Sequence, residues 1–178
     1  MKNYSRIALL SLLTLTIACS GAKETTTNSS TTTSSSSMYP VWYGSFEFSA
    51  DSSSFHARAT AVASNANTAK IRAEKEARAL LESYIAKELE NVRSELERDG
   101  SDIVSEPAFI LKLRNAHLKV EEEATVLQSD SKQIEGVFRG FAKVEINKQT
   151  LHRLLEQGFS GNRAYWNTFS SSKSFTEL

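Results

Sequence analysis

From Asn67 to Arg98, apolar residues recur in steps of three, four and seven, which places them on one face of a single long helix. These positions are Ala69, Ala73, Ala77, Leu80, Leu81, Tyr84, Ile85, Leu89, Val92 and Leu96. Asn65 or Asn67 can cap the start of the helix, and Asp99-Gly100 ends it. The alanine-rich first half can lie tightly on a sheet, whereas the larger side chains of the second half need more room. We therefore expect the second half to project past the sheet edge.

Two alternating stretches precede the long helix and predict a β-hairpin. Apolar or small residues alternate with polar ones from Trp42 to Phe48, and again from Phe55 to Ala63. The turn residues Asp51 to Ser54 lie between the two stretches. The alternating face of the second stretch is mostly alanine, so another element can lie close against that strand.

A further helix and a second hairpin are expected after the long helix. Pro107 favours a helix that begins after Ser105 or Glu106. Its apolar stripe consists of Phe109, Leu113 and Ala116, with His117 at the end. Alternation over residues 118–126 and 138–146 then predicts two strands, with a turn at Ser129-Asp130-Ser131.

The last predicted element is a short helix. Asn147 can cap it, Leu151, Leu154 and Leu155 face inward, and Gly158 lies at its C-terminal stop. The complete order is strand, strand, helix, helix, strand, strand, helix. This order predicts an α+β fold, a single compact domain with one long and two shorter helices on an antiparallel sheet.

The chain begins with the pattern of a bacterial lipoprotein signal. Two basic residues, Lys2 and Arg6, precede an apolar run that ends in a lipobox-like Thr16-Ile17-Ala18-Cys19. The run is shorter than the roughly 20 apolar residues that span a bilayer, and its flanks are typical of a secretory signal. The alternative is a buried N-terminal helix with a chance cysteine. We expect residues 1–18 to be removed and lipid on Cys19 to anchor the protein to a membrane.

The rest of the chain divides by composition. Between Ser20 and Ser37, 13 of 18 residues are Ser or Thr, so residues 19–37 are interpreted as the lipidated cysteine and a flexible tether. An O-glycosylated stalk is the alternative. Residues 38–158 have the length of one α+β domain. Residues 159–178 are polar with embedded aromatic side chains, and are expected to form a C-terminal tail.

The charge balance and the single cysteine exclude several classes of function. Removing Lys2 and Arg6 from the 21 basic residues leaves 19 against 21 acidic residues, so there is no basic excess for nucleic acid. With Cys19 lipidated, no thiol remains for a disulfide or for a cysteine metal site.

No pattern in the sequence indicates catalysis, a cofactor or a metal ion. The histidines at 56, 117 and 152 have no partner at ligand spacing. The carboxylates at 121–123 would point to alternate faces of a strand, which favours a solvated edge. Serine-nucleophile and phosphate-loop motifs are missing too. We therefore expect a protein that is not an enzyme.

Some large apolar residues are candidates for contact with a partner. Trp42 stands where the tether becomes the domain, and is interpreted as a core lid or as an exposed contact. Tyr165 and Trp166 lie in the polar tail, where they either meet a partner or fold back onto the sheet. The end of the long helix offers a self-association surface at Leu89, Val92 and Leu96.

Several of these features together resemble the lipoprotein-20 family of small bacterial outer-membrane lipoproteins, a group that includes a flagellar basal-disk protein. The likeness covers about Met38 to Gly158. It consists of Pro40-x-Trp42, the strand Ala57-Arg58-Ala59-Thr60-Ala61, the helix with Ala69, Ala73, Ala77 and Leu80-Leu81, and the closing strand Gly140-Phe141-Ala142-Lys143-Val144-Glu145-Ile146. Membership implies a non-enzymatic envelope protein of compact α+β fold that sometimes assembles into rings or larger arrays.

The expected function is that of a lipid-anchored structural or interaction module of the cell envelope. Its place is the periplasmic side of the outer membrane, and its partners are a second copy of itself or another envelope protein. The alternative is a carrier for an apolar envelope ligand. A carrier needs a sizeable apolar cavity, and the alanine-rich interface argues against one.

Overall fold

Four antiparallel strands form one sheet in the computed structural model, which describes residues 38–178. The strand order is β1-β2-β4-β3. The strands are β1 (Phe48–Ala50), β2 (Ser54–Ala63), β3 (Thr125–Ile134) and β4 (Val137–Asn147). The central pair β2–β4 runs in register from Ser54 opposite Asn147 to Ala63 opposite Phe138.

One face of the sheet is covered by the first half of α1 (Ala66–Arg98). Asn65 caps this helix by accepting a hydrogen bond from the backbone N–H of Thr68. The alanines at 69, 73 and 77 are fully buried against the small residues of β2 and β4. The prediction of a long helix that lies closely on an alanine-rich strand is therefore confirmed.

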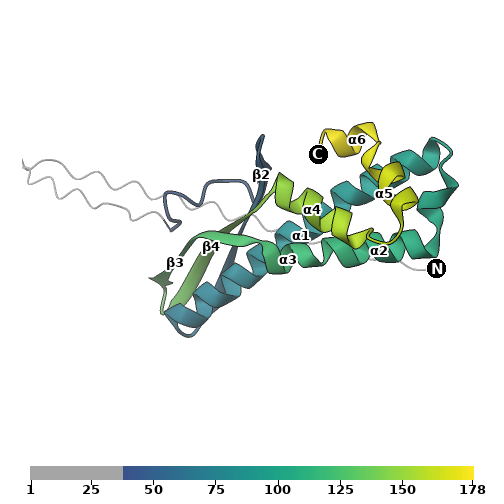
Figure 1. Ribbon diagram of the computed structural model, residues 1–178. Coiled ribbons are helices and arrows are strands. Elements are labelled where there is room, and N and C mark those ends of the chain that lie inside the picture. Colours follow the sequence, from purple (N-terminus) through teal and green to yellow (C-terminus); the bar gives the residue numbers. More distant parts are fainter. Residues whose placement is uncertain (1–37) are drawn as a thin grey trace, which may run out of the picture. The chain divides into compact units, whose positions relative to one another are not determined.

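The second half of α1 extends beyond the sheet, and shorter helices gather around it (Figure 1). These helices are η1 (Asp102–Ser105), α2 (Pro107–His117), α3 (Lys119–Glu123), α4 (Lys148–Gly158), α5 (Arg163–Ser170) and α6 (Lys173–Thr176). Their apolar side chains continue the core that begins under the sheet. Phe109, Phe159 and Phe169 are at most 1 % exposed there.

The predicted α+β class with an antiparallel sheet is confirmed, and so are most of the element types. The helix after Pro107 buries Phe109, Leu113 and Ala116 as expected. The helix capped by Asn147 buries its three inward leucines.

The second hairpin differs from the prediction in its start and in its turn. Residues Lys119–Glu123 form α3 instead of a strand, since Val120 packs into the core from a helical turn. The strand starts at Thr125 and runs straight through Ser129-Asp130-Ser131. The chain reverses at Glu135 and Gly136, both of which have positive φ, as a tight two-residue hairpin turn requires.

The first hairpin also departs from the prediction, because β1 is only three residues long. The stretch from Trp42 to Glu47 is turn and irregular backbone, with Gly44 at φ +66°. Only Phe48–Ala50 pairs with β2, opposite residues 55–57. Within residues 38–178, no strand therefore lies beside most of β2 on that side.

The aromatic residues after Gly158 join the core. Tyr165, Phe169 and Phe175 are buried, and Trp166 packs against them. The composition of residues 159–178 predicted a polar tail. In the structure, α5 and α6 of this segment belong to the folded unit. The expected signal at 1–18, the lipid site Cys19 and the tether to residue 37 lie outside the described residues.

Candidate functional site

The edge of β2 from Ala59 to Ala63 is the most distinctive surface of the described chain. Pairing with β1 covers residues 55–57, and the backbone N–H of Arg58 still donates to the Glu47 carbonyl at 2.7 Å. Beyond this point no described strand lies beside β2 on that side. An uncovered edge presents backbone donors and acceptors to any extended segment that approaches it.

The strand geometry fixes which backbone groups face the open side. Along a strand, the backbone N–H and C=O groups of successive residues point to opposite sides. Because the Arg58 N–H points away from β4, the N–H and C=O groups of Thr60 and Val62 also point away from β4. The Val62 carbonyl already accepts a hydrogen bond from Arg72 Nη1 of α1 at 3.2 Å. The groups left to bind another segment are the C=O of Arg58, both groups of Thr60 and the N–H of Val62.

A groove of about 500 Å³ runs along this edge. Tyr43 and Glu47 form one wall, and α1 forms the other with Glu76, Ala79, Leu80 and Ser83. Its floor is β2 from Arg58 to Ala61. The groove leaves the strand edge accessible. Its walls contain the apolar side chains of Ala79 and Leu80 and the carboxylates of Glu47 and Glu76.

The wall that contains Tyr43 is held in place by aromatic packing. Tyr39 and Tyr43 stack on each other with centroids 5.4 Å apart, and both meet the edge of Phe141 at 5.7 and 5.5 Å. Phe141 points to the sheet face opposite α1 and is fully buried there. Burial, followed by the charge of Glu47, raises the pKa of the Tyr43 hydroxyl above its usual range.

Arg58 joins the same wall to the strand. Its Nη1 donates to the Phe46 carbonyl at 2.9 Å, which ties the irregular segment to β2. The segment before β1 thus ends its pairing with β2 at a defined point, and the groove begins there.

The opposite edge of the sheet, on β3, differs in character. A bulge lies between Val126 and Gln128, and the charged side chains of Asp130 and Lys132 lie farther along the strand. Bulges and charges are the features that discourage pairing at an edge. Between Ala59 and Ala63, β2 has neither feature.

The structure places the six candidate contact residues in different parts of the molecule. Leu89 and Val92 are at most 1 % exposed, and Leu96 packs against the core beside them. This corrects the expectation of an association surface at the end of α1, because η1, α2, α5 and α6 cover that half of the helix.

The aromatic candidates are also mostly packed. Tyr165 is 6 % exposed and donates a hydrogen bond to the carboxylate of Glu106. Trp166 lies against His152 and Phe175, with centroids 5.1 and 5.7 Å away. Trp42 is half-buried beside Tyr43, in the segment that ends at the groove.

Over residues 38–178, no group of three or more His, Cys, Asp or Glu side chains is placed to hold a metal ion. The three histidines lie apart, and two of them are paired with carboxylates. His56 Nε2 lies 2.9 Å from Asp51, and His117 Nδ1 lies 2.6 Å from Glu82.

Sequence reasoning missed the open edge because it extended the first strand back to Trp42. Gly44, at positive φ, and Pro40, which is buried beside the turn, were the available signals. Both residues interrupt strands, so a short β1 could have been expected.

Comparison with known proteins gave no match to a family model, to a curated protein or to a solved structure. None of the described helices combines the length and the apolar character needed to cross a bilayer.

Proposed function

We propose that this chain is a lipid-anchored, non-enzymatic interaction module of the bacterial cell envelope, which joins a second copy through the open edge of β2. The observation that supports self-association is the edge from Arg58 to Val62, with its defined set of available backbone groups. The anchor is proposed from the lipobox-like sequence at Cys19, and the outer membrane from the resemblance to the lipoprotein-20 family.

The edge is complementary to itself around a twofold axis at Thr60. In an antiparallel pair of two β2 strands, the Thr60 residues face each other and exchange two N–H to C=O bonds. Val62 of each copy comes level with Arg58 of the other, where Glu47 already lies, so the two strands pair only from Ala59 to Ala61. The Arg58 N–H and the Val62 C=O, which face the same side, are already bonded within each chain.

The segment before β1 limits the paired stretch at both ends. Val62 and Ala63 of one copy come level with Arg58 and Ala57 of the other, beside which Glu47 and Phe48 already lie, so each chain turns away from its partner after Ala61. The paired stretch is short, so the affinity in dilute solution is expected to be low. Anchoring both copies on one membrane raises their effective concentration and favours the pair.

The mass of the protein in solution tests the pairing. We would measure sedimentation equilibrium on the full chain with Cys19→Ser, at increasing concentration. A dimer should form in the parent and in Thr60→Val, which keeps the backbone N–H. It should weaken in Thr60→Pro, which removes an outward N–H without removing a bond to β4. Equal masses for the Pro and Val variants at every concentration would count against the proposal.

The anchor has a test of its own. Cys19→Ala should abolish labelling with a fatty-acid analogue and release the protein from the membrane fraction. Continued labelling and membrane retention of this variant would contradict the proposed lipid site.

A further inference from the structure

A second hollow lies at the opposite end of β2 from Thr60, between α4 and α6. Its volume is about 370 Å³, which falls within the range of small-molecule sites. The lining consists of Phe55, Lys148, Gln149, Leu151, His152, Leu155, Ser170, Phe175, Thr176 and Leu178. The alanine-rich interface under the sheet is closely packed, whereas this hollow lies in the helical part of the fold.

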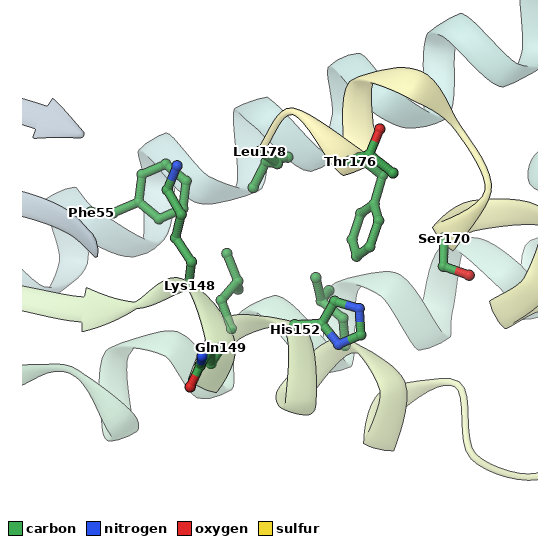
Figure 2. Close-up of a pocket in the computed structure, with 10 residues that line it drawn as sticks. Phe55, Lys148, Gln149, His152, Ser170, Thr176 and Leu178 are labelled. Carbon is green, nitrogen blue, oxygen red and sulfur yellow. The ribbon is translucent and has the colours of Figure 1, made fainter. Parts of the chain in front are cut away.

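The hollow is apolar inside and cationic at its edge. Phe55, Leu155 and Phe175 supply buried side chains. Lys148 stands at one end, with its Nζ 5.1 Å from the centroid of the Phe55 ring. Figure 2 shows the Lys148 side chain at the left end of the hollow, with its nitrogen beside Phe55, and His152 across from Thr176 and Leu178.

None of the ten lining residues has an acidic side chain. A lysine beside an aromatic ring and an apolar cavity, with no acidic side chain in the lining, favours a ligand that has an apolar chain and a negative head group. The flexible stem of lysine lets its ammonium group turn from the ring toward such a head group.

We propose that this hollow binds a single-chain fatty acid, with the acyl chain among Phe55, Leu151, Leu155 and Phe175 and the carboxylate paired with Lys148. The site uses no residue of the β2 groove, so it stands independently of self-association. It gives the chain a second activity, the reversible binding of an anionic single-chain lipid.

Trp166 provides a signal close to the site. Its ring contacts His152 and Phe175, both of which line the hollow. The chain has two tryptophans, so Trp42→Phe leaves Trp166 as the only one. A fatty acid that enters the hollow should change the emission of Trp166.

The test is a titration of the full chain, carrying Cys19→Ser and Trp42→Phe, with octanoate, decanoate and dodecanoate below their micelle concentrations. Saturable binding is expected, with a Kd that falls roughly three- to fourfold for each added methylene group. Binding that fails to saturate, or an affinity that does not change with chain length, overturns the proposal.

The head-group contact is tested with Lys148→Gln, whose folding is verified by circular dichroism. Dodecanoate should bind at least about tenfold more weakly to this variant, whereas dodecanol should bind equally to variant and parent. Lys87→Gln, which removes an exposed lysine from α1, is the matched control and should bind dodecanoate like the parent. Equal dodecanoate affinity in Lys148→Gln and parent would contradict the assigned role of Lys148.

Discussion

Gly140 of β4 lies directly against the backbone of Ala69 on α1. A Cβ atom at position 140 would be 2.0 Å from the Ala69 carbonyl oxygen and 2.7 Å from the Lys70 nitrogen. The atoms in the way belong to the helix backbone, so they cannot rotate aside as a side chain would. This contact sets how closely α1 lies on the sheet, and thereby positions the groove between α1 and the edge of β2.

Gly140→Ala should therefore destabilise the fold by about 1–3 kcal/mol, since the helix must lift from the sheet. Urea unfolding of the full chain measures the change. An unchanged unfolding midpoint would show that α1 is less closely fixed than the contact implies.

Gly158 has an equivalent role between two helices. A Cβ there would lie 2.4 Å from the Cβ of Ala116 on α2. Gly158→Ala should lower stability, and adding Ala116→Gly should recover part of the loss because the second change removes the obstructing methyl group. A double-mutant cycle measures this coupling. Strictly additive effects would contradict a direct clash.

The turn at Glu135-Gly136 gives a prediction in the opposite direction. Glu135 has φ +51°, a conformation that asparagine adopts at lower cost than glutamate. Glu135→Asn should raise the free energy of unfolding by up to about 1 kcal/mol. Gly136→Ala, at φ +82°, should lower it, and thermal unfolding of the two variants would compare them.

The turn before β2 should make stability depend on pH. Hydrogen bonds from His56, from the backbone N–H groups of Ser53 and Ser54, and from the Ser53 hydroxyl hold the pKa of Asp51 well below its usual value of 3.8. A lowered folded pKa stabilises the fold above the unfolded pKa, and the contribution is lost as pH falls below it. Asp51→Asn should therefore be less stable than the parent at neutral pH, and the difference should shrink below about pH 4. Urea midpoints at several pH values measure it, and a constant difference would contradict the account.

The long helix and the short helices were predictable because their signals are local. Asn65, Asn147 and Pro107 mark helix starts, and the apolar spacing of α1 needs no knowledge of its partners. The fold class followed from the order of these elements.

The predictions that were wrong concern features that depend on tertiary packing. The apolar alternation near Val120 fits a strand equally well, and only its burial beside α1 selects a helix. Glu135 is an uncommon residue for a tight turn, so the reversal was expected at the more typical Ser129-Asp130-Ser131. Leu89 and Val92 were expected on a surface because the covering helices α5 and α6 lie in a segment of polar composition.

The open edge of β2 was beyond sequence reasoning for a similar reason. Its availability depends on where β1 stops, which is set by the hydrogen bonds of Arg58 to Phe46 and Glu47. The apolar hollow likewise exists only because α6 folds back over α4.

A disulfide at position 60 tests the central claim most directly. In the full chain with Cys19→Ser, Thr60→Cys creates a single thiol at the proposed twofold axis. Facing residues of a hydrogen-bonded antiparallel pair have Cα atoms about 5.5 Å apart, within the range of about 4.4–6.8 Å that a disulfide spans. The account predicts a covalent dimer under mild oxidation, more rapidly than for Lys75→Cys, an exposed position on α1. Equal or slower crosslinking at position 60 than at position 75 would contradict pairing through β2.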